Sequence, residues 1–126
     1  YGSLAHGLLT GAFDETTVFD EGDWRSRGGL FNMKLFTEEN FPRNLNVVSD
    51  LVGIARDMGK EMYHLALRWV LSNPTLSVAL VGARKPEEVE ANMGALGWSL
   101  SEAELTVLDA AFDRYGVETR PDVWVE

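Results

Sequence analysis

A basic pair follows a short apolar run in the second half of the chain, in the stretch SVALVGARKPEE. The junction itself consists of Gly82, Ala83, Arg84 and Lys85. The pattern predicts a strand over residues 77–81 and a helix that begins at Pro86, because proline suits the first helical position. Backbone amides at such a junction point outward, and both the helix dipole and the two cations favour an anion. The junction therefore predicts a phosphate site, although a solvated turn with a basic pair before an acidic helix would read the same way.

The opening segment, YGSLAHGLLTG, is a second candidate for phosphate binding. Gly2 and Gly7 would allow the backbone to approach a pyrophosphate closely. The segment is not a P-loop, since it lacks the GK[ST] ending, and it is not a GxGxxG motif. Taken alone, it is a weak signal, and a plain turn is the better interpretation.

Other kinds of chemistry find little support. No pair of carboxylates suggests glycosidase chemistry, and the absence of cysteine removes thiolate metal sites and disulfides. His6 stands alone in a turn, where a backbone-contact position is expected rather than a base. His64 lies in a predicted helix, where a helix-surface or packing role is expected. The glutamates Glu87, Glu88 and Glu90 form a dipole-favoured helix start and a solvated face.

The net charge and the hydropathy of the chain limit which partners and locations are expected. The net charge of −9 disfavours nucleic acid and anionic membrane, because phosphate contacts require a basic surface. No apolar run approaches the roughly 18 residues of a membrane span, and no signal-peptide pattern opens the chain. A cytoplasmic location is therefore expected. The chain starts without methionine and directly on a glycine-rich turn, so we expect a fragment, a processed product or the ordered part of a longer protein.

Periodicity predicts a mostly helical chain with one strand. Helices are expected over residues 44–58, 61–73 and 86–96, and the third would turn Val89, Met93 and Leu96 inward. A fourth helix opens with the capping box of Ser101 and Glu104. Residues 12–40 have no clean period and hold aromatic side chains that look exposed, which is typical of a lid, a binding loop or a disordered segment. The strand at 77–81 reads as buried on both faces. Its backbone would need partner strands from elsewhere.

Four segments in order resemble the aldo-keto reductases: YGSLAHGLLTG, GDWRSR, LALRWVLSNP and VALVGARKPEEVEANMGAL. The likeness runs from Tyr1 to about Phe112 and is greatest for bacterial reductases related to voltage-gated potassium-channel β subunits. The resemblance implies an α/β fold, the C-terminal portion of a (β/α)8 TIM barrel. It implies an NADP(H)-dependent oxidoreductase that interconverts carbonyls and alcohols. Residues 1–126 would be one partial domain, in which 12–40 is a loop that clamps the cofactor and 113–126 is a tail.

The resemblance also implies which residues bind the cofactor. Tyr1 would stack on the nicotinamide, and Arg25 or Arg27 would belong to the closing loop. The pyrophosphate would lie along Gly2, Leu4, His6 and Thr10. The 2′-phosphate would be held by Arg84 and Lys85 in the junction that also contains Gly82 and Ala83, and the adenosine half would meet Glu88 and Asn92.

Some positions depart from the family pattern. Ala12 replaces a frequent lysine or arginine, Ser3 stands where proline is usual, Glu88 replaces a frequent glutamine, and Ala91 replaces an acidic residue. These departures affect the fine geometry of adenine binding. Arg84 and Lys85 still favour NADP over NAD, since a 2′-phosphate needs cationic partners.

The catalytic Asp, Tyr, Lys and His of the family have no counterpart in this sequence. Tyr63 and Tyr115 do not match the context of the catalytic tyrosine, so no catalytic residue and no metal ligand are assigned. We therefore expect the chain alone to be inactive on its small carbonyl substrate and to require a missing N-terminal barrel half or another copy. Two alternatives remain open: a non-catalytic, cofactor-sensing regulatory subunit, and a helical interaction domain without nucleotide affinity.

Overall fold

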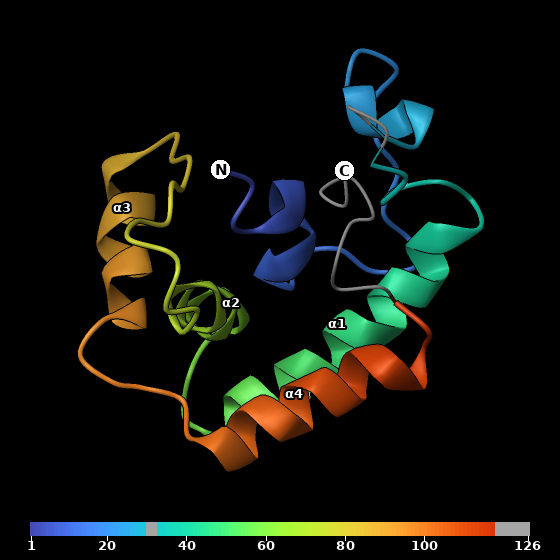
Figure 1. The fold of residues 1–126 in the computed structure, drawn as a ribbon. Helices are drawn as coiled ribbons and strands as arrows, with labels where there is room; N and C mark the ends of the chain where they lie inside the picture. Colours follow the sequence, from blue (N-terminus) through green and yellow to red (C-terminus); the bar gives the residue numbers. More distant parts are fainter. Residues whose placement is uncertain (30–32, 118–126) are drawn as a thin grey trace.

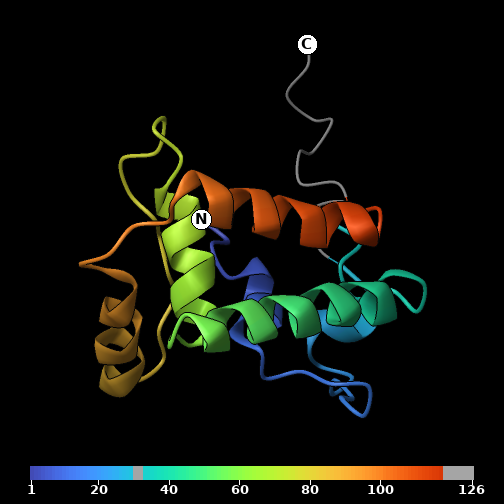
Figure 2. The ribbon, with the colours of Figure 1, turned by 90° about the horizontal axis from the view of Figure 1, so that it is seen from below.

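Two long antiparallel helices lie side by side in the computed structural model, which describes residues 1–29 and 33–117 (Figures 1 and 2). They are α1 (Asn40–Asp57) and α4 (Glu102–Arg114). The shorter helix α2 (Met62–Leu71) crosses one end of this pair, and α3 (Pro86–Asn92) lies beyond it (Figure 2). The described residues also form three 3-10 turns: η1 (Ala5–Thr10), η2 (Trp24–Arg27) and η3 (Met93–Ala95).

Side-chain caps explain where two of these helices begin. At α4 the predicted capping box is confirmed: Ser101 Oγ accepts from the Glu104 amide at 3.3 Å, and Glu104 Oε2 accepts from the Ser101 amide at 2.7 Å. At α2 the amide of Glu61 donates to Nδ1 of His64 at 3.4 Å. Each contact satisfies an amide that the first helical turn leaves without an internal partner.

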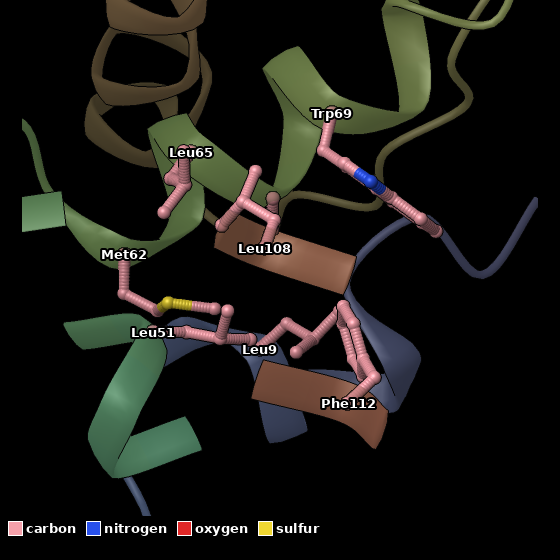
Figure 3. Close-up of a pocket in the computed structure, with 8 residues that line it drawn as sticks. Leu9, Leu51, Met62, Leu65, Trp69, Leu108 and Phe112 are labelled. Atoms are coloured by element: carbon pink, nitrogen blue, oxygen red, sulfur yellow. The ribbon is translucent and has the colours of Figure 1, made fainter. Parts of the chain in front are cut away.

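The main core forms where α1, α2 and α4 meet. Its buried members are Val47, Leu51, Ala55, Met62, Leu65, Ala66, Leu108 and Ala111. Their spacing on each helix gives one apolar face, which the helix buries against its neighbours. A small cavity of about 20 Å³ lies among Leu9, Leu65, Leu108 and other apolar side chains (Figure 3). Its lining is apolar throughout, so it belongs to the core and offers no chemistry.

The described residues of the long loop are packed and not open. Phe36 is 6% exposed and joins Leu8 and Val48 in a second buried cluster. Phe13 and Phe19 lie edge-on at 5.3 Å between ring centroids, a favoured geometry for aromatic pairs. The expectation of exposed aromatics was therefore wrong for these rings. The loop is also one residue shorter than expected, because α1 begins at Asn40.

The predicted strand at 77–81 is absent: the described residues form no strand there, and Val78 and Leu80 are 65% and 62% exposed. A strand requires a neighbour to pair with, and none is present in the described part of the chain. The inward face expected for α3 is also wrong, since Val89, Met93 and Leu96 are about half exposed. That helix ends at Asn92, where a 3-10 turn takes over.

The remaining helix boundaries differ by a few residues from the predicted ones. The first helix starts four residues early, and α2 stops at Leu71 instead of residue 73. Among the described residues, no helix is long and apolar enough to cross a membrane. Most of the predicted tail, residues 118–126, lies outside the described residues.

Candidate functional site: a turn and a basic junction

The N-terminal turn has an unusual backbone. Ala5 and His6 have φ values of 46° and 57°, and Gly7 follows at 98°. Non-glycine residues in this left-handed region carry strain, and such strain often marks functional backbone. Thr10 Oγ1 donates to the Gly7 carbonyl at 2.6 Å and ties the turn together. Gly2, at φ 80°, faces open space, with nothing within 4 Å of the place a Cβ would take.

Residues 82–85 lie at the surface just before α3. Gly82, Ala83, Arg84 and Lys85 are all exposed. The amides of Gly82 and Ala83 donate no hydrogen bond to any other described residue. The predicted junction therefore presents two cations and two uncommitted amides, although an irregular segment and not a strand leads into it.

Glu88 reaches back from α3 to this junction. Its Oε2 accepts from the Arg84 amide at 2.7 Å, and its Oε1 lies 3.3 Å from the Arg84 guanidinium. The hydrogen bond from the Arg84 amide lowers the pKa of the Glu88 carboxyl below its ordinary value, with a smaller contribution from the guanidinium charge. The carboxylate thus stays ionised beside the cation.

One hydrogen bond joins the two candidate half-sites. Ser3 Oγ donates to the carbonyl oxygen of Leu80 at 3.1 Å, across 77 positions of sequence. Figure 1 shows the N-terminus on the same side of the molecule as the loop that leads into α3. The structure therefore brings the turn and the basic junction to one side. The sequence drew attention to Ser3 only as a departure from proline, and no sequence signal named Leu80 as its partner.

Of the two loop arginines, Arg25 is held by its surroundings. Its guanidinium pairs with Asp23, its Nη1 donates to the His6 carbonyl at 3.3 Å, and it lies over the Phe19 ring at 4.9 Å. The side-chain hydrogen bond from Arg25 lowers the pKa of Asp23. Arg27 is exposed and forms no ion pair with the described residues. Sequence reasoning missed Asp23, although its position two residues before Arg25 is a usable signal.

The other predicted site residues are spread along these elements. Tyr1 is 87% exposed, Leu4 and Asn92 are half-buried, and the His6 ring lies edge-on to Trp24 at 5.0 Å. Within the described residues, no hydrogen bond joins Asn92 to the N-terminal turn. The hydrogen bonds thus connect the turn, the basic junction and Glu88, whereas Asn92 is not linked to the turn.

His64 has the packing role expected of it. Its Nε2 lies 2.7 Å from the carbonyl oxygen of Ala91, and it packs against Gly94, where an added Cβ would come within 2.3 Å of Nε2. The ring therefore fixes α2 against α3 and η3. Within the described residues, no group of three or more His, Cys, Asp or Glu side chains could hold a metal ion.

The profile of the Aldo/keto reductase family matches residues 1–113. The aldo-keto reductase YhdN of Bacillus subtilis is 39% identical over 82% of this chain and 30% of its own length. A probable voltage-gated potassium channel subunit beta of Arabidopsis thaliana is 32% identical over 74% of this chain and 27% of its own. The solved glycerol dehydrogenase AKR11B4 of Gluconobacter oxydans matches the whole chain and 37% of its own, with a TM-score of 0.83 and 32% identity.

The protein belongs to the Aldo/keto reductase family. This confirms the resemblance that the four ordered segments indicated, including the relation to potassium-channel β subunits. The helices match an aldo-keto reductase structure over their full extent. The chain spans about 30% of the length of the curated relatives described above.

Proposed function

We propose that this chain supplies the dinucleotide-binding part of an NADP(H)-dependent oxidoreductase that interconverts carbonyls and alcohols. The observation that carries the proposal is the hydrogen bond between Ser3 and Leu80, which joins the strained turn to the basic junction. A dinucleotide needs both a pyrophosphate site and a site for its adenosine end. The turn and the junction offer these at linked positions.

The donor groups fit phosphate chemistry. Arg84 and Lys85 are exposed cations, and the amides of Gly82 and Ala83 donate no hydrogen bond to other described residues. A phosphate oxygen accepts from amides and cations of this kind. At the turn, the open space at Gly2 leaves the backbone accessible to a pyrophosphate. Two adjacent cations favour the 2′-phosphate of NADP(H) over the hydroxyl of NAD(H).

The chain's own residues bind and orient the cofactor in this proposal. When bound, the nicotinamide supplies the hydride that is exchanged with a carbonyl carbon. Tyr1, whose ring is exposed, can stack against a flat ring. Of the loop arginines, Arg27 is the one available to an anion, because Arg25 is engaged by Asp23 and the turn. No proton donor is assigned here, and we place that group in the rest of the barrel.

An apolar surface next to the junction is suited to contact the rest of the barrel. Leu76, Val78 and Leu80 lie in the irregular segment before the junction and are 45% to 65% exposed. Val89 and Met93 add the half-exposed face of α3. An apolar run beside an uncovered helix face is what a parallel sheet covered by helices requires. We propose that the remaining strands of the barrel cover this surface, since the match spans only 30% and 27% of the lengths of these relatives. We also propose a cytoplasmic location.

Fluorescence titration tests the proposal. NADPH added to the chain should quench the tryptophan emission with saturation, and the variant in which Arg84 and Lys85 are both alanine should bind more weakly. Glu102→Gln and Glu87→Gln serve as surface controls that should bind normally. Lack of saturable binding by the wild-type protein would reject the function. In an assay that follows NADPH absorbance in the presence of a general aldehyde substrate, the 126-residue chain alone should not oxidise NADPH.

A second function rests on the similarity to the Arabidopsis potassium channel subunit. The protein would then sense the cofactor and regulate a partner without turnover. The two functions differ in one measurement, because the naturally expressed protein should oxidise NADPH with an aldehyde only if it is an enzyme. Binding with no turnover under those conditions would favour the regulatory role. A helical interaction domain would bind no nucleotide at all.

A further inference from the structure

Glu88 and Arg84 form a pair at the place where the 2′-position of the ribose would be recognised. The carboxylate binds both the main-chain amide of Arg84, at 2.7 Å, and its guanidinium, at 3.3 Å. The Arg84 side chain is 89% exposed, and that of Glu88 is 36% exposed. The cation therefore remains accessible to a ligand, but a negative charge already stands beside it.

The two side chains favour opposite ligands. A cationic side chain selects the 2′-phosphate of NADP, whereas a carboxylate selects NAD by accepting from the 2′-hydroxyl. A carboxylate next to a phosphate dianion also repels it. We propose that Glu88 is a specificity-determining residue, which reduces the preference of the site for NADP(H) over NAD(H) so that both dinucleotides bind. The inference rests on the proposed function and deepens it.

The hydrogen bond from the Arg84 amide holds the Glu88 carboxylate next to the position that a 2′-phosphate would take. An exposed glutamate could otherwise swing away from an incoming phosphate, at little cost, by rotating its side chain. Glu88 is anchored by the Arg84 amide as well as by the ion pair. The same hydrogen bond from the Arg84 amide lowers the pKa of the Glu88 carboxyl, so the group stays charged near neutral pH. Glutamine at this position would keep the hydrogen bond and lose the charge.

Paired titrations of the naturally expressed protein test the inference. Dissociation constants for NADPH and NADH are measured for wild type, Glu88→Gln and Glu87→Gln. The control removes the same charge one residue earlier in α3, at a side chain that forms no ion pair with Arg84 within the described chain. Glu88→Gln should raise the NADPH-to-NADH affinity ratio about two- to fivefold, the scale of an exposed charge pair. The control should leave the ratio near the wild-type value.

Smaller probes confine the effect to the adenosine end. Adenosine 2′,5′-bisphosphate should gain affinity in Glu88→Gln by a similar factor, and adenosine 5′-monophosphate should not. An unchanged or lowered dinucleotide ratio, or an equal change in Glu87→Gln, would overturn the inference while leaving the proposed function standing. Failure of both dinucleotides to bind the folded wild-type protein, as judged by circular dichroism, would overturn the proposed function and this inference together.

Discussion

The Ser3 hydroxyl donates to the Leu80 carbonyl oxygen at 3.1 Å and joins two segments that the sequence keeps 77 positions apart. The turn contributes the strained backbone of Ala5 and His6, and Leu80 leads directly into the basic junction. A proline at position 3 could not donate this bond. In this chain the Ser3 side chain therefore links the two half-sites.

Ser3→Ala should weaken NADPH binding about twofold to tenfold, the range expected from the net contribution of one hydrogen bond. The effect acts on affinity because the bond sets the spacing between the two phosphate-binding segments. Ser3→Thr keeps the hydroxyl and should bind nearly as wild type in the same fluorescence titration. Equal losses in the alanine and threonine variants would show that the hydroxyl has no such role.

Leu108 and Val107 are neighbours on α4 with opposite environments, at 2% and 51% exposure. Leu108 faces the cavity among the three main helices (Figure 3). Leu108→Ala should lower the free energy of unfolding by about 2–5 kcal/mol, the usual cost of removing a buried leucine. Val107→Ala should change it by less than about 0.5 kcal/mol. Urea unfolding followed by circular dichroism measures both, and similar losses in the two variants would contradict the packing of α4.

The helical part of the fold was predictable because its signals are local. Apolar periodicity placed all four helices to within a few residues, and the Ser101 capping box marked the start of α4 correctly. The prediction of a strand at 77–81 was wrong. An apolar run indicates that a segment is suited to burial, but it does not show whether a neighbouring strand is present to pair with it. The same reason explains Val89 and Met93, whose stripe points to a surface that the described residues do not cover.

The site was predictable in its residue types and not in its pairings. The sequence pointed to the basic junction and to two loop arginines, but it could not separate Arg25 from Arg27. That distinction depends on Asp23, on the His6 carbonyl and on stacking over Phe19, which only the folded loop brings together. The assignment of these residues to a cofactor stays a prediction.

Gly94 should be intolerant of a side chain. An added Cβ would lie 2.3 Å from His64 Nε2, and the ring cannot move away without losing its 2.7 Å contact with the Ala91 carbonyl. Gly94→Ala should destabilise the protein by about 1–3 kcal/mol. Gly53→Ala is the matched control, because nothing lies within 4 Å of its Cβ position in α1. That change should stabilise the helix by up to about 1 kcal/mol.

Chemical unfolding of the two glycine variants checks this expectation, and a double variant sharpens it. With His64→Ala present, the Gly94→Ala substitution should cost much less, since the clash is gone. Full additivity of the two losses would show that His64 and Gly94 do not constrain each other.

Acid should destabilise the protein through carboxylates that accept hydrogen bonds. The pKa of Glu104 is lowered chiefly by the Ser101 hydroxyl, and those of Asp14 and Asp23 are lowered by Thr16 and Arg25. A lowered pKa means that the folded state binds fewer protons than the unfolded one. The stabilisation is therefore present above the ordinary carboxyl pKa of about 4, and it is lost as the pH falls through the lower folded-state values.

Glu104→Gln should flatten the acid side of the stability profile, because glutamine keeps a hydrogen-bond acceptor at the α4 cap but does not titrate. Glu102→Gln is the control from the same helical turn, and its carboxylate accepts no hydrogen bond from the other described residues. The urea midpoint of each protein is measured in steps from about pH 6 to about pH 3, spanning the ordinary carboxyl range. The decline should be shallower in Glu104→Gln than in the control. Equal slopes would mean that the capping contact with Ser101 does not form in solution.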